Sequence, residues 1–243
     1  MATSATDLLW MERMAQATEI KVMQSAAFKE AYLELAPEFE RATGHKLVTL
    51  WVPSVQMTNR LKGGETVDVV ILSASSLDEL IQAGRVVPGS RVDLARSGIG
   101  VAVRSGAPKP DISSGETVKR ALLNAKAIAY STGPSGIYLA SLFERMGIAD
   151  QLKPKLRRVQ GEPAGGVVAR GEADLAFQQV SELLPVAGID LVGPLPPDIQ
   201  KITTFSAGIC VGAKEPDAAK ALIHFLTAPA AAPVIRKKGM EPA

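Results

Sequence analysis

A nearly continuous run of β-branched and aliphatic residues constrains the fold of this chain most strongly. Residues 67–72 read Val-Asp-Val-Val-Ile-Leu, and a short apolar run of this kind is typical of a strand that is buried on both faces, as in a parallel sheet. Two strand–loop–helix units precede it. Because strands and helices alternate, we expect a twisted sheet with helices on both of its faces.

The same alternation returns after a turn-rich segment at residues 108–114. Further strands are predicted at 20–23, 47–52, 98–103, 127–130, 174–177, 189–192 and 203–211, and helices at 28–42, 54–63, 77–83, 117–124, 137–146, 164–170, 178–184 and 216–226. We therefore predict an α/β protein of two doubly wound lobes with a ligand cleft between them. The predicted divisions are a lead-in at 1–18, a discontinuous lobe 1 at 19–102 plus 204–243, and lobe 2 at 103–203.

Charge and cysteine content exclude several classes of protein. The 27 basic and 25 acidic residues give a net charge of +2, too small for a general nucleic-acid binder, so we predict no nucleic-acid partner. With Cys210 as the single cysteine, neither an internal disulfide nor a CxxC zinc site can form. His45, expected to be exposed after a helix end, and His224, on a helix wall, are predicted to have no catalytic or ligand role. We expect no metal and no cofactor.

Three local features carry expectations of their own. Pro37 falls inside the first helix and predicts a kink or restart there. Either Ser75 or Ser76 is expected to cap the helix at 77–83. The basic cluster of Lys153, Lys155, Arg157 and Arg158 is predicted to be a solvated turn.

Three small polar loops, at residues 24–27, 53–55 and 131–136, follow predicted strands and open helices. Ligands of open α/β sheets bind at the carboxyl ends of the strands, where helix N-termini present unpaired N–H groups. We expect the loops to converge on a small anion, although each by itself is also consistent with an ordinary helix cap. The candidate ligand-binding residues are Ser25, Ala26, Ser54, Ser131, Thr132, Gly133, Ser135 and Gly136.

Two amides, Gln178 and Gln179, follow the strand at 174–177 and complete the candidate site. They can donate to or accept from an oxygen-rich ligand, although a solvated strand end is an equal alternative. The acids nearest to these loops are Glu162, Glu172 and Glu182. None of them has a histidine or a second acid at a spacing typical of a catalytic pair. Acid–base chemistry is possible, but no sequence pattern indicates it, and we predict no catalytic residue.

Several motifs resemble those of the type II periplasmic binding proteins, in particular the molybdate-binding branch. They are Ile20–Ala26, Phe39–Gly44, Val67–Ile71 and Gly171–Phe177. The resemblance implies two α/β lobes that close on a ligand, Ser25 and Ser54 as serines that hold an oxyanion, and the 131–136 loop as the part of lobe 2 that completes the site. Gln179 stands where that branch has a tyrosine, and the 53–56 turn lacks the glycine–serine-rich sequence usual there.

Two segments, Phe177–Leu184 and Gly193–Pro197, resemble a less studied branch that includes an aconitate isomerase-like enzyme. This likeness leaves two hypotheses. The first is a solute-binding protein that holds a small oxyanion or a di- or tricarboxylate and delivers it to the membrane subunits of an ABC transporter. The second is an isomerase of an unsaturated carboxylic acid on the same scaffold, with Lys29, Arg60 or Arg96 as cationic partners of the substrate.

The N-terminus shows no recognisable secretory signal, because it carries Asp7, Glu12 and Arg13 and its best apolar run is only Leu8–Met11. We expect a periplasmic location if a signal segment has been removed and a cytoplasmic location otherwise.

Overall fold

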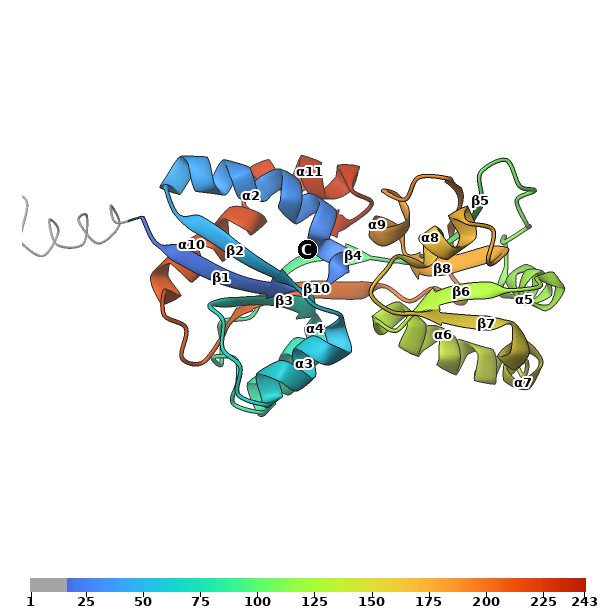
Figure 1. Ribbon diagram of the computed structural model, residues 1–243, viewed down its shortest axis with the longest axis horizontal. Helices are drawn as coiled ribbons and strands as arrows, with labels where there is room; N and C mark the ends of the chain where they lie inside the picture. The colour runs from blue at the N-terminus through green and yellow to red at the C-terminus, as the bar shows by residue number, and fades with distance from the viewer. Residues whose placement is uncertain (1–16) are drawn as a thin grey trace, which may run out of the picture.

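The computed structural model describes residues 17–243 and has two α/β lobes side by side (Figure 1). The predicted fold class is confirmed. The predicted lead-in falls almost entirely outside the described residues. The first sheet has the strand order β11-β4-β10-β3-β1-β2 and the second has the order β7-β6-β8-β5-β9.

Lobe 1 contains elements from both ends of the chain. Its strands are β1 (Glu19–Gln24), β2 (Lys46–Trp51), β3 (Val69–Ser73), β4 (Val92–Ser97), β10 (Thr203–Ile209) and β11 (Glu241–Pro242). Its helices are η1 (Ala26–Phe28), α2 (Lys29–Thr43), α3 (Ser54–Lys62), α4 (Ala74–Gln82), α10 (Pro216–Thr227), η3 (Pro229–Ala231) and α11 (Ala232–Lys237). Lobe 2 has the strands β5 (Ile99–Arg104), β6 (Ile128–Ser131), β7 (Leu156–Val159), β8 (Leu175–Gln179) and β9 (Ile189–Pro194). Its helices are α5 (Gly115–Asn124), α6 (Pro134–Arg145), α7 (Ala149–Leu152), η2 (Lys153–Lys155), α8 (Ala164–Ala169) and α9 (Val180–Leu183).

The two sheets share one plan. In each, three strands are parallel (β2-β1-β3 and β7-β6-β8), and an antiparallel strand, β10 or β5, lies beside the third. Strand β3 is buried along its whole length, as its apolar sequence predicts. Each sheet has an apolar core on both faces: α2 and α10 cover one face of the first sheet and α3 and α4 the other, while α5 and α6 oppose α8 and α9 on the second.

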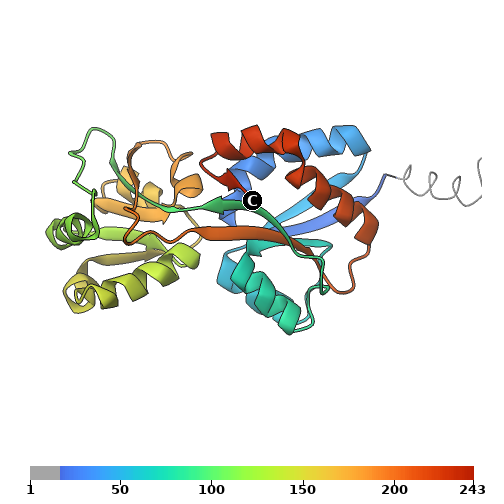
Figure 2. The ribbon, with the colours of Figure 1, turned by 180° about the vertical axis from the view of Figure 1, so that it is seen from behind.

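Two connections join the lobes, and Figure 2 shows both of them crossing from one lobe to the other. One runs from β4 through Gly98 into β5, and the other leads from β9 to β10. Residues 99–102 pair with β8 and β9 of the second sheet. The chain therefore changes sheets at Gly98, whereas the sequence placed the end of the first segment at residue 102.

Four local expectations are corrected, in whole or in part. Helix α2 continues through Pro37, so the predicted restart is wrong; the missing N–H costs one bond that the surrounding packing tolerates. His45 is buried, because its Nδ1 accepts the Thr18 N–H (3.3 Å) and its ring stacks on Phe39. Arg157 and Arg158 are exposed to solvent, as predicted, but lie in edge strand β7 rather than in a turn.

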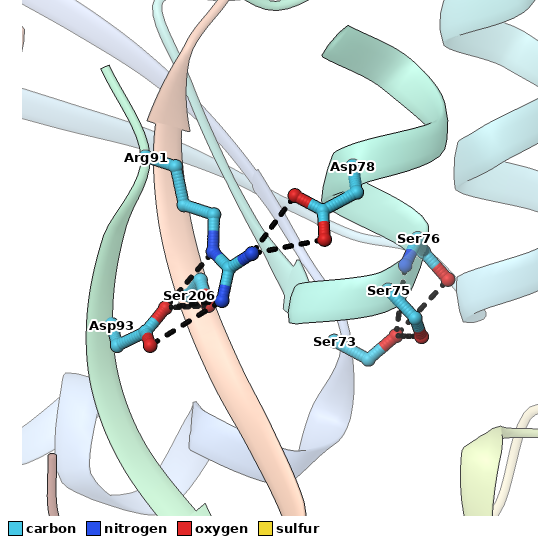
Figure 3. Close-up of polar contacts among 7 residues, drawn as sticks. All are labelled: Ser73, Ser75, Ser76, Asp78, Arg91, Asp93 and Ser206. Carbon is cyan, nitrogen blue, oxygen red and sulfur yellow. Dashed lines mark hydrogen bonds and ion pairs between the residues drawn. The ribbon is translucent and has the colours of Figure 1, made fainter. Parts of the chain in front are cut away.

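The fourth correction concerns the cap of α4, which is Ser73: its Oγ accepts the Ser76 N–H at 3.4 Å (Figure 3). The same view shows Arg91 between two carboxylates. Its Nη1 donates to Asp78 of α4 at 2.8 Å, and its Nε donates to Asp93 of β4 at 3.0 Å. This ion-pair network joins α4 to β4 beside the bulge in β10.

Candidate functional site

A cavity of about 310 Å³ lies between the lobes, at the carboxyl ends of β1, β2, β6 and β8. This volume is at the lower end of the range for small-molecule sites. From lobe 1 the cavity is lined by Ser25, Ala26, Lys29, Trp51 and Ser54, among others. From lobe 2 it is lined by Ser131, Thr132, Gly133, Gln178, Ser181 and Glu182, among others. The structure thus brings seven of the ten predicted residues to one cleft.

The helices that open on the cleft have no side-chain caps. Ser25 precedes η1, Pro53 precedes α3 and Gly133 precedes α6, and none of these residues caps its helix through a side chain. In the first turn of α3 and, after Pro134, in the first turn of α6, the N–H groups are therefore not used by side-chain caps. The positive ends of these two helix dipoles, one from each lobe, are suited to hold an anionic group in the cleft.

Ser135 and Gly136 build the 131–136 loop and do not line the cavity. The Ser131 and Ser135 hydroxyls lie 3.1 Å apart, and Ser131 Oγ also accepts the Gly133 N–H at 3.3 Å. A Cβ at position 136 would lie 1.6 Å from the Ser131 carbonyl oxygen. Only glycine permits this close approach of α6 to the end of β6. The approach turns Ser131 and Thr132 toward the cleft.

Lys29 places a positive charge at the cleft. Its Nζ lies 5.5 Å from the centroid of the Trp51 ring, which also lines the cavity, a distance at which a cation and an aromatic face attract. The other two predicted cationic partners lie elsewhere. Arg60 pairs with Glu65 (2.6 Å), and Arg96 donates to the carbonyl of Pro242.

Carboxyl and amide groups line the cleft at the β8–α9 junction. The Gln178 Oε1 accepts the Ala164 N–H at 2.7 Å, and its Nε2 donates to Oε1 of Glu182 at 2.9 Å. Burial raises the pKa of Glu182 to about 7, and the Gln178 hydrogen bond opposes this rise. The neighbouring Ser181 hydroxyl is buried and has no partner among the described residues. No sequence pattern predicts Ser181 as part of the site, because no spacing rule singles it out.

Glu162 also lines the cleft, but its charge is paired. Arg170 donates to it at 2.8 Å and to Glu172 at the same distance. The hydrogen bonds from Arg170 lower the pKa of both carboxyls. Glu172 is exposed and does not line the cavity. Glu182 thus differs from Glu162 in having an amide rather than a guanidinium as its partner.

Gln179 does not line the cavity; it lies between the two connections that join the lobes. Its amide is best satisfied with the nitrogen donating to the carbonyls of Ser97 (3.1 Å) and Gly98 (3.2 Å) and the oxygen accepting from the Thr203 hydroxyl (3.3 Å). The side chain is buried. Its hydrogen bonds join β8 to both inter-lobe connections. Gln179 therefore has a structural position and does not contact the cavity.

Among residues 17–243, no group of three or more His, Cys, Asp or Glu side chains is arranged to hold a metal ion. Within the same range no single helix is long and apolar enough to cross a membrane, and one bent pair, Pro216–Thr227 with Pro229–Lys237, meets that test by length and composition only. Cys210 is buried, as predicted.

The sequence profile of the family described as "Bacterial extracellular solute-binding protein" matches residues 20–241. The chain belongs to this family. It is 44% identical to an aconitate isomerase from a Pseudomonas species, over 93% of this chain and 88% of that protein. It is 28% identical to the molybdate-binding protein ModA of Azotobacter vinelandii, over 93% of this chain and 90% of that protein.

The solved structures show the same fold. The periplasmic molybdate-binding protein of Azotobacter vinelandii superposes with a TM-score of 0.75 at 22% identity, over 91% of this chain and 98% of that one. This similarity confirms the two-lobed architecture of the periplasmic binding proteins.

Proposed function

We propose that this member of the solute-binding family is an isomerase that interconverts the cis and trans forms of aconitate or of a closely related unsaturated tricarboxylate. The observation that carries the proposal is the pattern of charge in the cleft. Lys29 and the open end of α3 line the cleft from lobe 1, and the open end of α6 and the carboxyl group of Glu182 line it from lobe 2. The 44% identity to an aconitate isomerase supports the same conclusion.

A site that only binds a small oxyanion gains nothing from this carboxyl group. An ionised Glu182 would repel the ligand, and burial of such a group is costly. A proton-transfer reaction, in contrast, needs a group whose pKa lies near the working pH, and Glu182 with a pKa of about 7 meets that condition. The seryl hydroxyls and Lys29 would then hold the substrate carboxylates.

A second function, receptor of an ABC-type transporter, is favoured by the family match over residues 20–241 and by the molybdate-binding relatives. In that case the chain would work in the periplasm, bind a carboxylate or oxyanion between its lobes and present it to membrane subunits. Closure of the lobes about the two connections near Gly98 and Thr203 would bury the ligand. The cleft has the same donors for both functions.

One experiment separates the two. The protein is tested by thermal shift against molybdate, tungstate, sulfate, citrate, cis-aconitate and trans-aconitate, and each aconitate is then followed by proton NMR for conversion. At 100 times its dissociation constant a ligand stabilises the fold by about 2.7 kcal/mol. We expect stabilisation by the tricarboxylates and conversion of both aconitates. Binding of aconitate without conversion would favour the receptor, and stabilisation by molybdate alone would overturn the carboxylate ligand.

A further inference from the structure

Three polar side chains at the β8–α9 junction, Gln178, Ser181 and Glu182, share one wall of the cleft. The spacing i, i+3, i+4 brings them together because the strand ends at Gln179 and a helical turn starts at once. Helix α9 also packs against η1 of the other lobe. The wall therefore faces the loop that carries Ser25.

The backbone fixes the orientation of the Gln178 amide. Its Oε1 is occupied by the Ala164 N–H (2.7 Å), so its Nε2 is turned toward Glu182 (2.9 Å). Gln178 can therefore only donate to this carboxyl group. Among residues 17–243 no other hydrogen bond and no ion pair holds Glu182, which leaves Oε2 for a molecule in the cleft.

The charged groups around this wall leave Glu182 without a fixed counter-charge. Lys29 and Glu30 line the cavity from α2, and Glu162 lines it from the segment before α8 but is paired with Arg170, which also binds Glu172. Burial acts on Glu182 more strongly than any of these charges, because it is the first cause of its raised pKa. The group can change its protonation state near neutral pH.

We propose that the Glu182 carboxylate is the catalytic base of the isomerisation and that Gln178 is its positioning residue, an inference that rests on the proposed function. Glu182 takes a proton from the CH₂ group next to the double bond. The electron pair of the broken C–H bond spreads over the allylic carbons and the adjoining carboxylate. The protonated Glu182 then returns the proton to the carbon at the other end of the allylic system, so the double bond moves by one position.

This step is balanced within the site. One C–H bond breaks and one forms, the carboxyl group ends as it began, and no oxidant or co-reactant is consumed. The negative charge that develops on the substrate lies between the open ends of α3 and α6, whose N–H groups stabilise it without reorganising. The unpartnered hydroxyl of Ser181 supplies one further donor at the wall itself.

The test compares two carboxyl-to-amide variants. Glu182→Gln keeps the shape of the side chain and removes the base, and Glu172→Gln is the control because its carboxylate is exposed, lies outside the cavity and is paired with Arg170. Conversion of cis-aconitate is followed by proton NMR, and binding is measured by thermal shift. We expect Glu182→Gln to convert about 100-fold or more slowly than the wild type while still binding both isomers, and Glu172→Gln to remain within about threefold.

The dependence of the rate on pH separates a catalytic from a structural role. The ionised form of Glu182 is active, so kcat/KM of the wild type should fall as the pH drops below about 7. Gln178→Leu removes the hydrogen bond that lowers this pKa, and the fall should then begin at a higher pH. Glu182→Asp should be slower than the wild type but keep an acidic limb.

The outcomes are distinct. If the wild type binds the aconitates but does not convert them, the proposed function fails, and the inference with it. If the wild type converts them and Glu182→Gln does so at a similar rate, only the inference fails. A Gln178→Leu variant whose rate falls without any movement of the acidic limb would overturn the positioning role.

Discussion

Each lobe contains one helix that begins with a side-chain cap and one that begins without it. In lobe 1, α4 is capped by the Ser73 hydroxyl, while α3 follows Pro53 and has no side-chain cap. In lobe 2, α5 has a complete capping box between Ser114 and Thr117, while α6 follows Gly133 without one. The uncapped member of each pair is the one that opens on the cleft.

The difference shows where hydrogen-bonding capacity is kept for a ligand. A capped helix uses its first N–H groups within the protein and gains about 1 kcal/mol of stability. An uncapped helix leaves those groups to water or to a bound molecule. Helix α10 also begins without a side-chain cap, so what sets α3 and α6 apart is that their open ends lie at the cleft, one from each lobe.

The largest effect is expected at the start of α6. In Gly136→Ala the new Cβ would lie 1.6 Å from the Ser131 carbonyl, a backbone atom that cannot move aside. We expect destabilisation by about 3 kcal/mol or more, at the upper end for overpacking. Gly133→Ala is the control, since its nearest neighbour would be Ser131 Oγ at 3.6 Å. Urea unfolding measures both, and equal stabilities would contradict this account of the loop.

The next effect concerns the serines of the cleft. Ser25→Ala and Ser54→Ala should each weaken binding of a tricarboxylate by about 1.5–3 kcal/mol, the usual range for a hydrogen bond to a charged group. Neither hydroxyl caps its helix, so the melting temperature without ligand should hardly change. Titration calorimetry measures the loss, and unchanged affinity in both variants would remove these serines from the site.

A smaller effect, on stability rather than on ligand binding, is expected for Ser114→Ala. Its hydroxyl accepts the Thr117 N–H at 3.2 Å, and its own N–H donates to the Thr117 hydroxyl at 3.0 Å. Loss of the cap should cost about 1 kcal/mol of stability and leave ligand affinity as it is. A change in affinity without a loss of stability would break the contrast between the two kinds of helix.

A further effect is a dependence of stability on pH. The pKa of Glu182 rises from an ordinary value of 4.5 to about 7 on folding, so the folded state holds its proton more tightly than the unfolded chain. The cost of ionising this group is absent below about pH 4.5 and complete above about pH 7. The difference in melting temperature between Glu182→Gln and the wild type should therefore be about 5 °C larger, in favour of the variant, at pH 8 than at pH 5. Calorimetry at the two values tests this, and a pH-independent difference would contradict the raised pKa.

Much of the fold could be predicted because it depends on local sequence. The apolar run of β3, the alternation of strands and helices and the polar loops after β1, β2 and β6 all appear in the order of residues. The missed strands, β4, β7 and the C-terminal β11, are short or polar, and β7 and β11 lie at sheet edges. They become strands by pairing with distant partners, such as β11 with β4, and no local pattern encodes that pairing.

The candidate site likewise has one part that the sequence predicts and another that only the structure shows. Ser25, Ser54, Ser131 and Thr132 could be predicted, since small polar residues between a strand and a helix mark the ligand edge of an open sheet. Gln178 and Gln179 are adjacent in sequence and identical in type, and only the structure separates them. Strand geometry turns successive side chains to opposite faces, so Gln178 lines the cleft while Gln179 ties together the inter-lobe connections.

The sequence alone thus determined the two α/β lobes and the donor side of the cleft, because periodicity and helix starts are local properties. The tertiary structure decided which charges the cleft contains. Lys29 lies beside Trp51, Glu162 is paired with Arg170, and Glu182 lies half-buried against an amide. These are relations between side chains from different elements. Burial sets the pKa of Glu182, and it exists only once the lobes have folded and face each other.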